Sequence, residues 1–170
     1  PTARLGLEID DAYAMGAEVL LAAGDFAGAR ERADIHVRLP FHSEDGHLAT
    51  SRRLKVDALA GEIERVLIDA EVFRRGWTRA GHPVTPNLAG GAYAVAMVHG
   101  LRGDAEARAE WLAITVDVGV DQTRMDGCIL AWAPTFDAIL ALHQGDPAEA
   151  LARMTLHPSD LRTWDGGEWR

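Results

Sequence analysis

Residues 141–150, ALHQGDPAEA, contain the clearest indication of how this chain folds. Gly145 follows an apolar segment and can take the left-handed backbone conformation that ends a helix, while the carboxylate of Asp146 can cap the next one. Pro147 suits a first helical position, and Glu149 lies three residues after the cap, as in a capping box. The stretch therefore predicts two helices joined by a tight corner.

The same corner recurs along the chain. Its other copies are Gly24-Asp25, Gly61-Glu62 and Gly103-Asp104, so successive glycines lie 37, 42 and 42 residues apart. Each copy stands between two segments with helical periodicity, and helix pairs in series form a solenoid. We expect an all-α fold, an α-solenoid of about four antiparallel helix pairs. Residues 1–170 would form a single helical-repeat domain, a fragment of a longer chain.

Two apolar stripes with helical spacing extend this prediction to the segments around the corners. One stripe consists of Leu59, Ile63, Val66, Ala70, Phe73 and Trp77, and the other of Leu5, Ile9, Ala12, Gly16, Leu20 and Ala23. We expect both stripes to face neighbouring helices. Pro134 either starts the helix before the last corner or bends it, because proline cannot donate a backbone hydrogen bond.

Composition and charge narrow the class of protein. Apolar residues make up 48% of the 170 residues and charged residues 25%, which is typical of globular proteins. The net charge of −9 opposes binding to nucleic acid or anionic lipid. A single cysteine and the lack of a long apolar run indicate a cytoplasmic protein that contacts no membrane.

The corners resemble those of tetratricopeptide repeats. In that family a small residue stands five positions after the corner glycine, as Ala29 and Ala150 do here. The equivalent positions of the middle corners hold Val66 and Arg108, and the intervals exceed the usual 34 residues. The resemblance implies a right-handed superhelix that binds a protein or peptide partner.

A narrower resemblance is to the helical-repeat regions of large LuxR/MalT-type bacterial transcriptional regulators and related ATPase-linked signalling proteins. It rests on residues 99–104 (HGLRGD), residues 141–148 (ALHQGDPA) and the segment from Trp164 to Arg170. It implies a module that relays a partner or effector signal to other domains of the parent chain. A homodimer through exposed repeat ends is a further expectation.

The repeat geometry also suggests a binding groove. Counted back from the corners, the positions that face the concave side of such a superhelix are Tyr93, Met97, Trp132, Thr135 and Ile139. Aromatic and methionine side chains are adaptable anchors for a peptide or an apolar ligand. The alternative interpretation is that these side chains pack against the connections between helix pairs.

Catalysis is not expected, and neither is a cofactor, because no nucleophile motif, Walker loop or dinucleotide fingerprint is present. Two other functions stay open: a small-molecule receptor with an enclosed cavity, and a metal-dependent enzyme using the loop with His36, His42 and His47. A solvated polar loop is the alternative for these histidines. The basic pairs Arg52-Arg53 and Arg74-Arg75 are typical of solvated helix faces.

Overall fold

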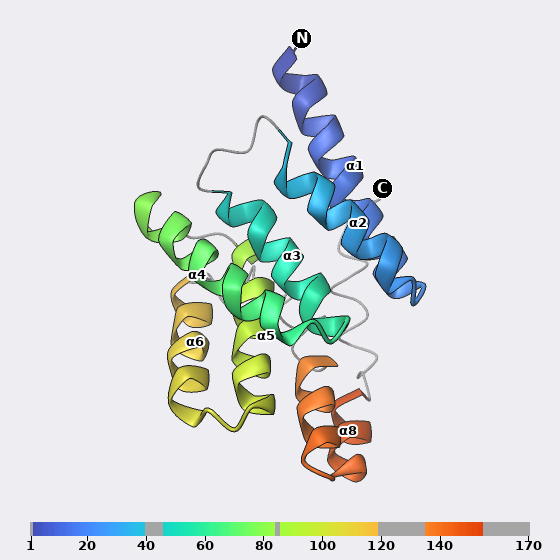
Figure 1. Ribbon diagram of the computed structural model, residues 1–170, viewed down its shortest axis with the longest axis vertical. Coiled ribbons are helices and arrows are strands. Elements are labelled where there is room, and N and C mark those ends of the chain that lie inside the picture. The colour runs from blue at the N-terminus through green and yellow to red at the C-terminus, as the bar shows by residue number, and fades with distance from the viewer. Residues whose placement is uncertain (1, 40–45, 84–85, 119–134, 155–170) are drawn as a thin grey trace. The chain divides into compact units, whose positions relative to one another are not determined.

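The computed structural model describes residues 2–39, 46–83, 86–118 and 135–154 (Figure 1). Every regular element within these ranges is an α-helix, which confirms the all-α prediction. The helices are α1 (Thr2–Ala22), α2 (Phe26–Val37), α3 (His47–Leu59), α4 (Ile63–Arg79), α5 (Pro86–Leu101), α6 (Ala105–Val118) and α8 (Pro147–Met154). Residues 135–143 are helical as well, whereas Pro134 lies outside the described residues.

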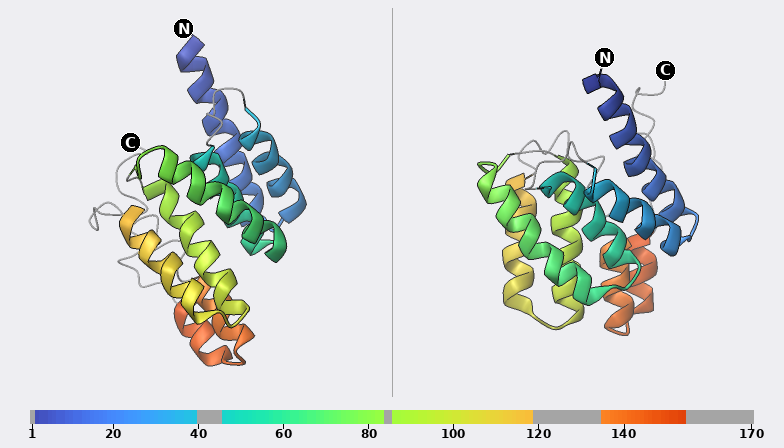
Figure 2. Two further views of the ribbon diagram at one scale, coloured as in Figure 1. Left: turned by 60° about the vertical axis from the view of Figure 1, so that its left-hand side comes forward. Right: turned by 45° about the horizontal axis from the view of Figure 1, so that its top comes forward.

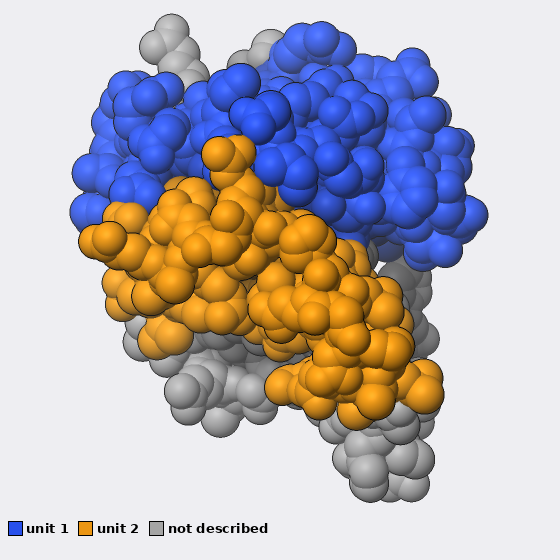
Figure 3. Space-filling model, turned by 60° about the horizontal axis from the view of Figure 1, so that its bottom comes forward, with its two compact units in different colours: residues 1–83 blue, residues 84–170 orange. Residues whose placement is uncertain are grey.

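The chain divides into two compact units, residues 1–83 and residues 84–170, which are coloured separately in Figure 3. In the first unit, α1 packs on α2, α2 on α3 and α3 on α4. In the second unit, α5 packs on α6, and the two helices lie side by side in Figures 1 and 2. The expectation of a single repeat domain stays a prediction.

All four predicted corners are present, with a left-handed glycine at each one. The φ angles are 79° at Gly24, 80° at Gly61, 74° at Gly103 and 81° at Gly145. After three of these glycines, an aspartate carboxylate accepts a hydrogen bond from the backbone N–H three residues further on, at 2.9–3.0 Å. The capping aspartates are Asp25, Asp104 and Asp146. Local sequence therefore determines these turns.

Two details of the corners differ from expectation. The Glu62 side chain makes no cap on α4, and its carboxylate instead pairs with Arg30 of α2. The capping box at the last corner is confirmed in one half, the bond from the Glu149 backbone N–H to the Asp146 carboxylate, and is wrong in the other. The backbone N–H of Asp146 donates to the carbonyl of Ala141, and the Glu149 carboxylate accepts a hydrogen bond from Arg153 instead.

The stripe predicted from Leu59 to Trp77 is confirmed after Ile63, and the other stripe is wrong at Ala12 and Ala23. The side chains of Leu5 and Ile9 lie outside the described residues. Val66, Ala70, Phe73 and Trp77 are buried, whereas Leu59 belongs to α3. On α1 the buried residues are Ala14, Ala17 and Leu21, and the expected Ala12 and Ala23 are exposed. Apolar residues occur around most of the described part of α1, including the exposed Met15 and Val19, so periodicity alone does not select the buried face.

The second unit is built around α5. From Leu88 to Val98 most of this helix is buried, so it lacks a polar face. Leu140 packs against Gly100 of α5, where an added Cβ atom would lie 3.1 Å from both its terminal carbons. Residues 135–143 also pack on α8, through a cluster of Ala138, Ala141 and Ala150. Small side chains thus permit close helix contacts on both sides of this segment.

The corner glycines predict a simple contrast in stability. Gly24→Ala should lower the free energy of unfolding by about 1 to 2 kcal/mol, because an alanine is strained at positive φ. Gly16→Ala should raise it by up to about 1 kcal/mol, since Gly16 is within α1 and no atom lies within 4 Å of its added Cβ. Urea unfolding of both variants measures the difference. Equal effects of the two substitutions would contradict the assigned corner.

Candidate functional site

Tyr93 on α5 is the best defined of the predicted groove residues. It is half-buried, as are Thr135 and Ile139, which lie one turn apart on the helical residues 135–143. Met97 is one turn after Tyr93 and is only 2% exposed. Trp132 lies outside the described residues. Tyr93, Thr135 and Ile139 are therefore the described groove residues that remain partly accessible.

The Tyr93 ring is held in place by polar and aromatic contacts. Its hydroxyl donates to the carboxylate of Asp137, with oxygens at 2.9 and 3.0 Å, and its ring stacks on Phe136 with centroids 6.0 Å apart. Burial raises the pKa of the Tyr93 phenol to about 12, and the negative charge of Asp137 adds to this effect. The phenol is therefore a neutral hydrogen-bond donor at physiological pH.

A second helix supports the same carboxylate. The Arg153 guanidinium of α8 lies 3.9 Å from Asp137 and donates to Glu149, one turn earlier on α8, at 2.6 Å. We call Tyr93, Phe136, Asp137 and Arg153 the Tyr93 cluster. It joins α5, residues 135–143 and α8, and it leaves Tyr93 with little rotational freedom.

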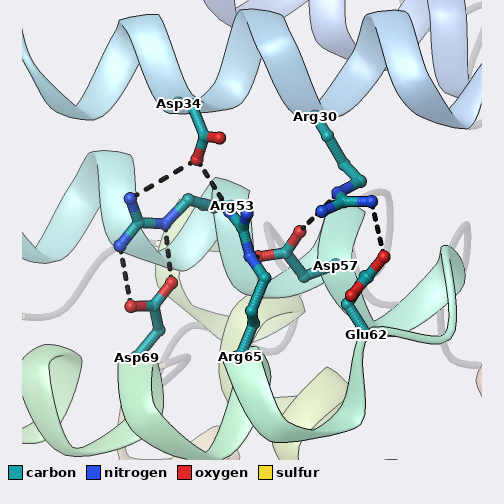
Figure 4. A network of polar contacts seen from close by, with 7 residues as sticks. All are labelled: Arg30, Asp34, Arg53, Asp57, Glu62, Arg65 and Asp69. Carbon is teal, nitrogen blue, oxygen red and sulfur yellow. Dashed lines mark hydrogen bonds and ion pairs between the residues drawn. The ribbon is translucent and has the colours of Figure 1, made fainter.

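The first unit contains a larger polar arrangement, which we call the ionic network (Figure 4). Its members come from α2, α3 and α4 with the residue that precedes α4: Arg30, Asp34, Arg53, Asp57, Glu62, Arg65 and Asp69. Three guanidinium groups thus face four carboxylates. The network bridges helices whose buried residues include Ala29, Ala33 and Ala49 as well as Leu54 and Phe73.

Most contacts in the ionic network are short. Arg53 forms a two-pronged pair with Asp69, at 2.6 and 2.7 Å. Arg65 donates to Asp34 at 2.8 Å and to Asp57 at 3.1 Å. The expectation that Arg53 lies on a solvated helix face is therefore wrong, because its helix packs against the acidic residues of two neighbours.

Asp57 occupies the centre of the network and has no exposed surface. Burial raises the pKa of the Asp57 carboxyl above its ordinary value, while Arg65 lowers it by its charge and its hydrogen bond. The free oxygen of Asp57 faces Nε of Arg30 at 3.5 Å, too far for a good hydrogen bond. The network therefore serves helix packing, with its cations committed to carboxylates of the same unit.

The predicted histidine loop is described in part. His36 is buried in the last turn of α2, with Nε2 3.3 Å from a guanidinium nitrogen of Arg52, and His47 is the first residue of α3. His42 lies outside the described residues. Among those that the structure describes, no three His, Cys, Asp or Glu side chains are placed to hold a metal ion. The metal-enzyme alternative stays a prediction.

No family model, no curated protein and no solved structure matches the chain. The resemblances to tetratricopeptide repeats and to LuxR/MalT-type regulators therefore depend on the corners and the stretches around them. Within the described residues, no helix has both the length and the apolar character needed to cross a membrane.

The ionic network predicts a large difference between two arginines. Arg53→Met should lower the free energy of unfolding by about 3 kcal/mol, because it leaves the buried Asp69 without its partner. Arg75→Met removes an exposed arginine from α4 and should change stability by less than about 0.5 kcal/mol. Chemical unfolding at neutral pH compares the two. Similar losses would show that the network adds nothing beyond surface charge.

Because the pKa of Asp57 is raised, its contribution to folding stability should increase in acid, whereas a carboxyl group with a lowered pKa contributes less there. Its folded-state pKa is above the ordinary 3.8, so the folded protein binds this proton more tightly than the unfolded chain does. The stability of the natural protein relative to Asp57→Asn should therefore rise as the pH falls from neutrality towards 3.8. Parallel unfolding curves at several pH values test it. A relative stability that falls with acid would indicate a depressed pKa instead.

Proposed function

We propose that this chain is an α-solenoid of antiparallel helix pairs that binds a protein or peptide partner. The recurring corner supports it, because left-handed glycines and aspartate caps join α1 to α2, α5 to α6 and residues 135–143 to α8. A series of such pairs would form a right-handed superhelix of the tetratricopeptide kind. Such superhelices use extended concave surfaces for binding.

The main support for the proposal is that the ring of Tyr93 is held in a fixed position. An aromatic residue whose ring is already fixed loses little conformational entropy on binding, so it makes an efficient anchor. Asp137 and Phe136 provide this restraint, and Thr135 and Ile139 are half-buried on the same helical segment. Their mixture of apolar area and hydrogen-bonding groups matches the composition of protein interfaces.

We further propose that the module belongs to a cytoplasmic transcriptional regulator of the LuxR/MalT type. The support for this assignment is the likeness of residues 99–104 and 141–148 to the repeats of those regulators. Both stretches coincide with corners that place a capping aspartate and a left-handed glycine. In this role, the binding of a partner at Tyr93 would be communicated to other domains of the parent chain.

Affinity capture with charge-bearing variants tests partner binding. The natural chain and Val116→Asp, which alters an exposed apolar residue of α6, should capture the same protein from a lysate of the source organism. Ile139→Asp and Thr135→Arg should reduce its recovery about tenfold or more, because a charge buried without a partner opposes association. Quantitative mass spectrometry measures recovery, and thermal unfolding checks that each variant is folded.

Two results would contradict the proposal. One is that no protein is enriched over a bead-only control by the natural chain. The other is that folded Ile139→Asp and Thr135→Arg variants capture the same proteins, in the same amounts, as Val116→Asp.

A further inference from the structure

Arg108 occupies a position that is apolar and buried at the other three corners. At each corner, the residue five positions after the glycine donates its backbone N–H to the carbonyl of the residue just after that glycine, at 2.9–3.1 Å. These equivalent residues are Ala29, Val66, Arg108 and Ala150. Ala29 and Val66 are 0% exposed and Ala150 is 4% exposed. A charged side chain at the third corner therefore needs a physical explanation.

Gly100 makes room for the Arg108 stem. A Cβ atom added to Gly100 would lie 3.2 Å from Cδ of Arg108 and 3.1 Å from the terminal carbons of Leu140. Such distances are tighter than most contacts of real Cβ atoms. The aliphatic part of the arginine is thus held between α5, α6 and the helical residues 135–143, and the direction of the side chain is restrained.

The Arg108 guanidinium is incompletely paired. Its Nε atom is buried, and no hydrogen-bond acceptor for it occurs among the residues that the structure describes. A buried donor on a charged group is costly when it has no acceptor. In the ionic network of the first unit, each guanidinium group pairs with at least one carboxylate, although Nε of Arg30 is also buried without a hydrogen bond.

An open pocket of about 250 Å³ lies beside Arg108. We call it the Arg108 pocket; its walls include Arg108, Gln144, Leu112, Leu140, Ala105 and Ala109. One cation and one amide therefore stand among aliphatic side chains and helix backbone. Sites for drug-sized ligands measure roughly 300–1,000 Å³, so this pocket fits a smaller molecule.

We propose that the Arg108 pocket binds a short-chain aliphatic monocarboxylate. The carboxylate would pair with the planar guanidinium, and the hydrocarbon chain would cover Leu112 and Leu140. The pocket has one cation, the chain has a net charge of −9, and Asp104 and Glu106 are exposed at the same corner. Anions with two or more charges are therefore disfavoured. This proposal goes beyond partner binding, since the pocket shares no residue with the Tyr93, Thr135 and Ile139 face.

Nuclear magnetic resonance titration of the ¹⁵N-labelled full chain tests the proposal. The probes are acetate, butyrate and hexanoate, with 1-hexanol and hexylamine as uncharged and cationic controls. Hexanoate should shift the Nε–Hε signal of Arg108 saturably, and affinity should rise by up to about fourfold for each buried methylene of the acid. The two controls should give no saturable shift of that signal.

Matched variants assign the effect to the pocket. Arg108→Gln should weaken hexanoate binding about tenfold or more, because it removes the charge-assisted hydrogen bonds. Arg102→Gln changes the net charge equally at an exposed position of the same corner and should bind as the natural chain does. Ala109→Leu should abolish binding by filling the pocket, and it decides the question if Arg108→Gln does not fold.

Five outcomes would overturn the proposal, and the first four concern hexanoate and its controls. These four are a lack of saturable shift with hexanoate, an equal loss in Arg102→Gln, unchanged binding in folded Ala109→Leu, and tighter binding of inorganic phosphate than of hexanoate. A further arm uses an acetylated tripeptide ending in leucine, which presents the same carboxylate at a chain terminus. If the tripeptide binds more tightly than hexanoate, the ligand is a peptide end and the free-acid assignment is wrong.

Discussion

A left-handed glycine ends one helix at each of the four corners, and the rest of the described structure depends on this backbone conformation. Because φ is between 74° and 81° there, the chain reverses within a few residues and the next helix begins beside the previous one. The position five residues beyond the glycine then faces the preceding helix, which restricts it to Ala29, Val66 and Ala150 at three corners. A short turn motif thus also determines which side chains fit the adjacent interface.

Small interface residues have an energetic consequence that the ionic network offsets. An alanine buries little apolar area, so contacts through Ala29, Ala33 and Ala49 contribute less than leucine-rich interfaces would. The two-pronged Arg53–Asp69 pair and the bonds from Arg65 to Asp34 and Asp57 add directional contacts between helices. They disfavour other registers, because a shift would leave buried carboxylates unpaired. The raised pKa of Asp57 indicates the cost of this arrangement: desolvation of its carboxylate exceeds the compensation from the arginines.

Features set by neighbouring residues could be predicted from the sequence, and features set by helix pairing could not. Gly145-Asp146 indicated its corner because glycine backbone and aspartate cap act within a few residues. The buried face of α1 was missed because apolar residues occur around most of the helix, and only contact with its neighbours selects Ala14, Ala17 and Leu21. The Arg53 to Asp69 pair was missed because it joins different helices.

The two candidate sites of the second unit differ in how their polar groups are satisfied. Tyr93 has an internal acceptor in Asp137, so its contribution to binding is a fixed shape and an apolar ring. Arg108 is held by packing around its stem while its buried Nε lacks an acceptor among the described residues, so its contribution is a hydrogen-bond donor that a ligand can satisfy. The sequence did contain a signal for Arg108, namely a charged residue where the other three corners have an apolar one. From the sequence alone, a charged residue at this position could equally be a solvated side chain. The burial of the equivalent residues shows that the position is an interior one.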